Sequence, residues 1–303
     1  MDKLQAMATF IRIVDRGSLS SASETLGTSL SSVVRTLARL EKSLGVRLLH
    51  RTTRRISLTE EGRHYLERCR RILAEIQDTE HALNAKERAP SGTLRVTAPV
   101  VFGEAYVAPI VSRFLEQHRG MQVDLVLLDR VVNLVEEGLD AAVRISHLSD
   151  SSLVAVRAGE LRRVVVASPT LLGATGTPKH PRNLAKLPCV RCTSLMAGGA
   201  WKFVEKDRTI SVDVSGPLAC NHAPACVDGC VAGLGFGMFI SYQVHRQLQA
   251  KQLKVVLTEF EPAPLPVSIV FPHGRLLPSR VRTFVDFAAA ELKTALERLA
   301  LRR

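Results

Sequence analysis

The sequence predicts a three-part chain: an all-α winged helix-turn-helix head, one long linker helix, and a two-lobed α/β region. Three observations lead to this fold class. Apolar residues recur at helical spacing through residues 1–58, they follow heptad spacing through residues 59–88, and strands alternate with helices from residue 93 onward. A chain of 303 residues is long enough for more than one folded unit.

Residues 1–58 predict three helices and a short β wing. Gly27 can adopt a left-handed turn between the second and third helices, and Ser29 can cap the third. Each helix has one apolar face. The residues of these three faces are Leu4, Met7, Ile11 and Val14; Leu19, Ala22 and Leu26; and Leu30, Val33, Leu37, Leu40 and Leu44.

The other face of the third helix is polar and cationic. Hydroxyl and guanidinium groups on the second helix of a helix-turn-helix pair suit the DNA major groove, where they can bond base edges and phosphates. A basic turn follows as a wing that can lie against the sugar-phosphate backbone. The predicted DNA-binding residues are Ser29, Ser31, Ser32, Arg35, Thr36, Arg39, Arg51, Thr52, Thr53, Arg54 and Arg55.

The charge distribution favours an anionic partner for this head. The chain has a formal charge of +12. Residues 1–58 hold ten Lys and Arg against four Asp and Glu, a net charge of +6, whereas residues 59–88 hold six against seven. Such a basic head suits double-stranded DNA, although a generally basic soluble protein is an alternative interpretation.

Residues 59–88 predict a linker helix that pairs with its copy in a homodimer. Thr59 can cap this helix, and Glu60 and Glu61 suit the positive end of its dipole. A narrow apolar seam favours a partner helix, while packing of the helix on its own head is the alternative. The seam residues are Tyr65, Cys69, Ile72, Ile76, Thr79 and Leu83. Pro90 and Gly92 then predict a hinge at 89–92.

From residue 93 the pattern predicts mostly parallel sheets with helices on both faces. The last strand and helix could not form a domain alone, so we expect lobe 1 at 93–162 and 267–303 and lobe 2 at 163–266. Strands are expected at 93–98, 122–128, 141–145, 164–167, 189–193, 201–204, 210–214, 235–240 and 267–271. Helices are expected at 102–118, 131–137, 182–187, 223–232, 242–249 and 279–299, with one near Thr170.

Two such lobes predict a cleft lined by strand ends and helix starts, which is an ordinary small-molecule site. Arg144 could grip a carboxylate with two bonds and so favours an anionic ligand, although pairing with a neighbouring acid is equally consistent. The predicted ligand-binding residues are Thr97, Pro99, Val100, Val101, Phe102, Arg144, Ser146, Ser168, Thr193, Ser194, Asn221 and His222.

The sequence contains no catalytic or metal-binding constellation, so we predict no enzyme, no metal and no cofactor. Cys189 and Cys192 have the spacing of a redox or zinc pair, but residues three apart on a strand face opposite sides, and one pair is an incomplete site. With no signal peptide and no apolar run of about 18 residues, we expect a cytoplasmic protein with reduced thiols and no membrane contact.

Several motifs along the chain are shared with one family. They include FIRIVDRGSL at 10–19, LE at 40–41, LG at 44–45, Leu48, Arg51, LTEEG at 58–62, GTLRVTAP at 92–99, DAAVR at 140–144, LLP at 276–278 and FVDF at 284–287. In these motifs the chain resembles the LysR-type transcriptional regulators over essentially its whole length.

The resemblance implies a DNA-binding regulator with a two-lobed effector domain similar to periplasmic binding proteins. It also implies dimers assembled into homotetramers, control of a nearby promoter through operator DNA, and RNA polymerase as a further partner. Arg35 keeps its family position, whereas Leu30 and Val34 stand where the family often has Gln and Ser. Wing contacts and DNA shape are therefore expected to contribute more to specificity. A solute-binding protein and a cleft enzyme are the alternative functions.

Overall fold

The structure is a computed structural model that describes residues 2–51, 56–83, 90–147, 153–195, 200–273 and 277–299. It divides into two units, Met1–Arg88 and Ala89–Arg303, and each is described by itself. None of the helices within the described ranges has the length and apolar character needed to cross a membrane.

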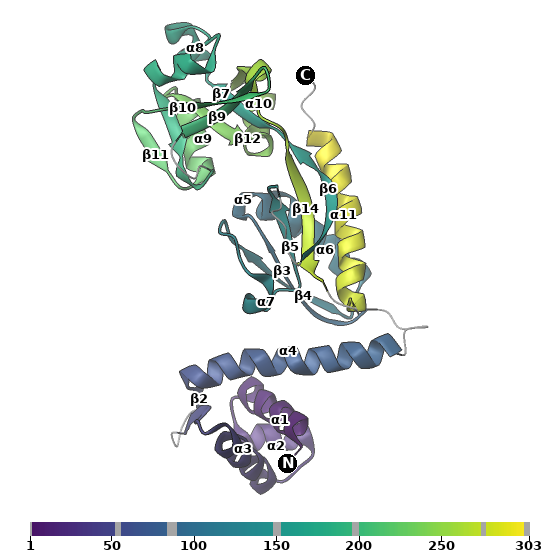
Figure 1. Ribbon diagram of the computed structural model, residues 1–303. Helices are drawn as coiled ribbons and strands as arrows, with labels where there is room; N and C mark the ends of the chain where they lie inside the picture. The colour runs from purple at the N-terminus through teal and green to yellow at the C-terminus, as the bar shows by residue number, and fades with distance from the viewer. Residues whose placement is uncertain are drawn as a thin grey trace. The chain divides into compact units, whose positions relative to one another are not determined.

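The first unit is a helical head followed by a long helix (Figure 1). Side chains cap the starts of the head helices, and Ser29 Oγ accepts a hydrogen bond from Ser32 N at 3.3 Å where the third helix begins. Gly27 has φ of 60° and makes the turn before it. The elements are α1 (Lys3–Arg16), α2 (Leu19–Leu26), α3 (Leu30–Leu44), β1 (Leu49–Arg51), β2 (Ile56–Leu58) and α4 (Glu60–Leu83).

The core of the head lies where the first three helices meet. Phe10, Ile13 and Leu40 have no exposed surface, and Leu37 is 1 % exposed. The helix α4 adds to this core, because the ring of Tyr65 lies 5.9 Å, centroid to centroid, from that of Phe10. The three helices therefore form one apolar cluster together with the start of α4.

This packing corrects the prediction that the whole seam of α4 is left for a partner helix. Cys69 is fully buried in the head core, and Leu66, which is outside the seam, is buried beside it. Cys69 belongs to the apolar cluster of the head, and Tyr65, the other seam residue nearest the head, packs against that cluster. Ile72 is 39 % exposed. The side chains of Thr79 and Leu83, and residues 84–89 of the predicted linker and hinge, lie outside the described residues.

Lobe 1 is built on a five-stranded sheet in the order β4-β3-β5-β14-β6. β3 is parallel to β4 and β5, whereas β14 is antiparallel to β5 and β6, so the prediction of a mostly parallel sheet is wrong for this half. The elements are β3 (Gly92–Ala98), α5 (Val100–Phe102), α6 (Ala108–Gln117), β4 (Met121–Leu127), α7 (Leu134–Glu137), β5 (Ala141–Ile145), β6 (Leu153–Leu161), β14 (Leu265–Pro272) and α11 (Ser279–Leu299).

Three elements of lobe 1 differ from the prediction. The helix expected at 102–118 is interrupted by a π-helical turn, Gly103–Val107, which keeps both Phe102 and Val107 buried against the sheet. The helix expected at 131–137 begins only after Asn133, whose side chain accepts hydrogen bonds from the N–H groups of residues 135 and 136. Strand β6 was not predicted, since charged residues interrupt its apolar pattern.

Lobe 2 has a second five-stranded sheet in the order β11-β8-β12-β7-β13. Here β7 is antiparallel to both neighbours, and β9 and β10 form a separate hairpin. The edge strands β11 and β13 were not predicted, because three residues are too few for a periodic pattern. The elements are β7 (Arg163–Ala167), α8 (Pro169–Thr175), β8 (Cys189–Cys192), β9 (Ala200–Glu205), β10 (Arg208–Asp213), β11 (Leu218–Cys220), α9 (Ala223–Val231), β12 (Phe236–Ile240), α10 (His245–Gln249) and β13 (Lys254–Val256). Short 3₁₀ turns cover Pro181–Lys186, Thr193–Leu195, Ser241–Val244 and Thr258–Phe260.

Two crossovers join the lobes. β6 leads into β7 at residue 162, and residues 257–264 lead from β13 back to β14. β14 then lies between β5 and β6, and α11, drawn in yellow, runs along this sheet (Figure 1). The last strand and helix thus complete lobe 1, while the lobe limits at 162 and 266 stay predictions.

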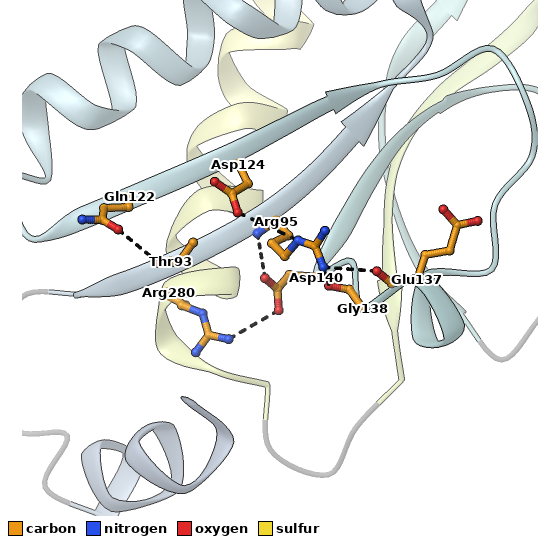
Figure 2. Close-up of polar contacts among 8 residues, drawn as sticks. All are labelled: Thr93, Arg95, Gln122, Asp124, Glu137, Gly138, Asp140 and Arg280. Atoms are coloured by element: carbon orange, nitrogen blue, oxygen red, sulfur yellow. Dashed lines mark hydrogen bonds and ion pairs between the residues drawn. The ribbon is translucent and has the colours of Figure 1, made fainter. Parts of the chain in front are cut away.

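A polar cluster attaches the start of α11 to lobe 1 (Figure 2). Asp140 accepts a hydrogen bond from Arg95 N at 2.8 Å through Oδ2, and its Oδ1 lies 3.4 Å from Nη2 of Arg280. Arg280 is 8 % exposed, and burial lowers the pKa of its guanidinium. The DAAVR motif therefore begins with a carboxylate that connects β3 to α11.

Candidate DNA-binding face and candidate ligand pocket

The polar face of α3 is solvent-accessible in the structure. Arg35 and Arg39 are exposed one turn apart, and Ser31 is exposed at the start of the helix. Ser32 and Thr36 are partly buried beside them. Leu30 is 46 % exposed on the first turn, so an apolar side chain occupies the end of the helix that would enter the groove first.

At the start of α3, the hydroxyl of Ser29 contacts both the backbone N–H of Ser32 and the hydroxyl of Ser31. Ser29 Oγ caps the helix and also lies 3.0 Å from Ser31 Oγ. The hydroxyl of Ser29 therefore holds the helix terminus, and Ser31 presents the more accessible hydroxyl. The arrangement provides one helix terminus, the guanidinium groups of Arg35 and Arg39, and the hydroxyls of Ser31, Ser32 and Thr36.

The wing is an antiparallel hairpin held to α3 by a carboxylate. Leu49 pairs with Leu58, and Glu41 Oε1 accepts hydrogen bonds from the N–H groups of Leu48 at 2.9 Å and Leu49 at 3.3 Å. Glu41 thus sets the position of the hairpin relative to the helix. Arg51 ends β1, but its side chain and the predicted wing residues Thr52, Thr53, Arg54 and Arg55 lie outside the described residues.

A pocket of about 210 Å³ lies between the two lobes. This is smaller than the roughly 300–1,000 Å³ typical of pockets for drug-sized ligands, so it suits a small molecule. Lobe 1, including Leu265 at the start of β14, contributes one side, and lobe 2 contributes the other. The lining residues are Pro99, Val101, Asp129, Ile145 and Leu265, and facing them Arg163, Ser194, Ala223, Ile240, Tyr242 and Gln243.

The pocket contains three of the predicted ligand-binding residues, namely Pro99, Val101 and Ser194. Val100 is next to it and donates its backbone N–H to Asp129 Oδ1 at 3.0 Å. Phe102 is fully buried and packs edge-on against Tyr242, with ring centroids 5.1 Å apart.

The other predicted ligand-binding residues do not line the pocket. Arg144 points to the other face of β5 from Ile145 and donates to the carbonyl oxygen of Val132 at 2.7 Å. Thr97 is 4 % exposed, and Ser168 is buried with its hydroxyl capping α8. Ser146, Thr193, Asn221 and His222 are exposed but do not line this pocket.

Two charged residues of the pocket were missed, for different reasons. Asp129 follows the end of β4 by two residues, so the strand-end argument could have included it. Arg163 is the first residue of β7, whereas the strand-end argument considers only residues that follow the end of a strand. β7 is antiparallel to β12, and Arg163 is paired with Ile240 at the end of β12. The mixed sheet therefore brings a strand start to the edge where strand ends were expected.

Burial changes the proton affinities of the polar groups in the pocket. The pKa of the Arg163 guanidinium is lowered because burial removes water from the charged form. The pKa of Tyr242 is raised, chiefly by burial, so this residue keeps its phenolic proton at neutral pH. Gln243 Nε2 donates to the Tyr242 oxygen at 3.4 Å, while Gln243 Oε1 accepts from Ile240 N at 3.0 Å.

The cysteines form no metal site among the residues that the structure describes. Cys189 and Cys192 lie on opposite faces of β8 and belong to different apolar clusters. Cys226 is fully buried and Cys220 is partly exposed. Burial raises the pKa of both Cys189 and Cys226 to about 12, which disfavours the thiolate form of each.

Comparison with known proteins places both units in the same group. Residues 4–63 match the bacterial regulatory helix-turn-helix proteins of the lysR family, and residues 87–293 match the LysR substrate binding domain. A transcriptional repressor of Pseudomonas aeruginosa is 32 % identical over 292 residues, covering 95 % of this chain and 91 % of the relative.

Two further proteins show similar coverage. The transcriptional activator AaeR of Escherichia coli is 30 % identical over 287 residues, covering 94 % of this chain and 93 % of AaeR. The solved structure of CrgA, described as a LysR-type transcriptional regulator from Neisseria meningitidis, superposes with a TM-score of 0.60 at 31 % identity, covering 95 % of this chain and 98 % of CrgA.

Proposed function

The chain belongs to the LysR family of DNA-binding transcriptional regulators, and we propose that a small, anionic effector bound between its lobes changes its affinity for operator DNA or the bend it imposes. The observation that carries the proposal is the pocket, which both lobes line in a chain that also has a helix-turn-helix head. A ligand that contacts both lobes can favour one arrangement of them, and this preference can be passed to the assembly on DNA.

In this proposal the exposed face of α3 contacts the operator. Arg35 makes the main contact to a base or phosphate, with Ser31, Ser32, Thr36 and Arg39 beside it and Ser29 at the helix terminus. The wing contacts the sugar-phosphate backbone of the operator through Arg51, Thr52, Thr53, Arg54 and Arg55. Because Leu30 occupies an exposed position on the first turn, we assign part of the specificity to DNA shape.

Gel shift with the chain's own upstream region tests the DNA-binding assignment. Arg35→Ala should weaken operator binding by about 1–3 kcal/mol, because a bidentate base contact or a phosphate contact is lost. Arg298→Ala removes the same charge from an exposed position on α11 and is the matched control. Equal affinity of the Arg35 variant and the wild type across several salt concentrations would remove Arg35 from the interface.

We also propose a homodimer through α4, assembled further into a homotetramer. The exposed seam residue Ile72 supports this, since an apolar side chain 39 % exposed on a long helix suits a partner surface. Sedimentation of Ile72→Glu should show a smaller assembly than the wild type, and an unchanged mass would contradict the placement of the interface. A regulator of this kind acts without enzymatic chemistry, in the cytoplasm, with RNA polymerase as a further partner.

The effector part of the proposal has its own test. Organic acids are screened for a rise in melting temperature of the full chain, and each acid that stabilises it is added to the gel shift. Stabilisation together with a change in operator affinity or DNA bend is expected. Stabilisation only by compounds that carry no carboxylate or other anionic group would contradict this part of the proposal.

A further inference from the structure

The pocket has one positive and one negative side. Of the eleven residues that line it, the charged ones are Arg163 and Asp129. Arg163 comes from β7 in lobe 2, and Asp129 follows β4 in lobe 1. A molecule that occupies the pocket therefore meets a guanidinium from one lobe and a carboxylate from the other.

Arg163 has no acceptor among the residues that the structure describes, and this distinguishes it from its neighbours. Arg162, directly before it, donates two hydrogen bonds to Glu261, and Arg144 donates to the carbonyl oxygen of Val132. The guanidinium is partly buried, yet none of its nitrogens is both fully buried and without a partner, so they remain accessible to a ligand. An anionic group of the ligand would supply that acceptor, and a carboxylate matches the planar fork of Arg.

Asp129 keeps a second anion away from the opposite side. Its Oδ1 accepts the backbone N–H of Val100 at 3.0 Å, so the donor that could have bound a ligand carboxylate already has an anionic partner. A second carboxylate placed there would be repelled. Asp129 is solvent-accessible, and a carboxylate can accept several hydrogen bonds, so it can still take a donor from a ligand.

The residues between these charges suit a short ligand. Tyr242 accepts a hydrogen bond from Gln243 and keeps its own O–H for donation, while Val101, Ile145 and Leu265 provide apolar surface. A volume of about 210 Å³ leaves room for a small molecule with its charged groups close together.

From this arrangement we infer that the effector is a small zwitterion, whose carboxylate binds Arg163 and whose protonated amine binds Asp129. The inference rests on the proposed function and deepens it by naming the chemical class of the ligand. A zwitterion engages both lobes at once, whereas a molecule with one charge engages only one of them. Its two ends therefore stabilise the lobe arrangement in which the pocket is closed around it.

The test uses the full chain, the standard amino acids, and two analogues of each amino acid that stabilises it. One analogue lacks the amine and the other lacks the carboxylate. Calorimetric titration should show binding of the amino acid and a loss of about tenfold or more for each analogue, because each lacks one charge-assisted contact.

Two variants test which residue binds each charged group of the ligand. Arg163→Gln should weaken binding of the amino acid and binding of its amine-free analogue to the same extent. Asp129→Asn should remove the preference for the amino acid over the amine-free analogue. Binding of the ligand carboxylate by Arg163 should be unchanged in this variant. The matched controls are Arg157→Gln and Asp228→Asn, which remove the same charges at exposed positions outside the pocket. Arg163→Lys and Asp129→Glu, which keep the charges, should retain the preference and show that the pocket remains folded.

The inference is overturned if no amino acid binds, if amine-free acids bind the wild type as tightly as amino acids, or if the preference survives in Asp129→Asn. Operator binding is measured on the same preparations. If an amine-free acid binds as tightly as the amino acids and alters operator affinity, the proposed function is supported but the inference of a zwitterionic effector is wrong. Failure of the wild type to bind its operator would count against the proposed function itself.

Discussion

Arg162 and Glu261, 99 residues apart in the sequence, form a two-bond ion pair between the two crossovers that join the lobes. Nε of Arg162 donates to Oε2 of Glu261 at 2.7 Å, and Nη2 donates to Oε1 at 2.6 Å. Their side chains are only 20 % and 13 % exposed. Because each residue belongs to a different crossover, the pair holds together the segments about which the lobes would move.

Glu261→Gln should therefore destabilise the lobed region. Loss of one partner leaves a largely buried guanidinium without its carboxylate, at a cost of about 1–3 kcal/mol, and thermal unfolding measures it. Glu137→Gln is the matched control, because Arg130 and Glu137 also form two bonds but Arg130 is 61 % exposed. A fall in melting temperature no larger for Glu261→Gln than for this control would show that the crossover pair has no special role.

Gly62→Ala should disrupt the junction of the wing with α4. A Cβ at this position would collide with the backbone oxygen of Leu48, and Thr59 Oγ1 already bonds to the N–H of residue 62 at 2.9 Å. We expect a loss of about 1–3 kcal/mol in stability, together with weaker operator binding.

The matched control for that change is Gly173→Ala on α8. A Cβ there meets no atom within 4 Å, and Ala favours a helix over Gly by about 0.5–1 kcal/mol. Thermal melts should therefore move in opposite directions for the two variants. If both change the melting temperature equally, the steric account of the LTEEG motif is wrong.

Asp140 should make stability depend on pH in a definite direction. Burial raises the pKa of its carboxyl in the folded chain, which opposes the bonds that favour the ionised form. A raised folded pKa means that the folded state binds the proton more tightly than the unfolded state. This contribution is present below the unfolded pKa, of about 3.9, and is lost as pH rises through the folded pKa.

The variant Asp140→Asn removes this titration and is the comparison for the wild type. Urea midpoints of the two proteins, measured from acidic to neutral pH, should show the wild type losing stability relative to the variant as the pH rises. If the stability of the wild type relative to the variant stays constant, or rises with pH, the raised pKa is contradicted.

Alkylation should separate the thiols by burial. With pKa values of about 12, Cys189 and Cys226 are thiolates to about one part in ten thousand at pH 8, and both are buried. Cys220 is partly exposed at the end of β11, so we expect it to react first with iodoacetamide. Mass spectrometry of timed samples identifies the modified peptide.

Cys220→Ser should remove the fast phase of that reaction. Rapid modification of Cys189 and Cys192 together would instead support a redox pair. Their side chains lie on opposite faces of β8, which does not allow a direct disulfide bond between them. Unfolding in urea before alkylation provides the reference rate for all six cysteines.

The head could be predicted almost element by element because its causes are local. Ser29 caps α3, Gly27 makes the turn before it, and the apolar period of three and four residues marks the buried face. The packing of Cys69 on the head is only one of two outcomes that the sequence allows, since a stripe on a helix does not say which surface covers it.

The pocket could be predicted only in outline. Pro99 and Val101 follow the end of β3, so the strand-end argument includes them. The charge of Arg144 favours it as a ligand contact, but on β5 its side chain faces away from that of Ile145, which does line the pocket. Choosing between adjacent residues of a strand requires knowing which face the neighbouring lobe covers.

The sequence by itself determined the three-part organisation, the helices of the head and the family, because periodicity, caps and motifs are properties of neighbouring residues. Only the tertiary structure decided that β7 runs antiparallel, that Arg163 and Asp129 line one pocket, and that Arg162 meets Glu261 across 99 residues. Strand direction and pairing depend on which long-range contacts give the most favourable packing, and no local pattern encodes that choice.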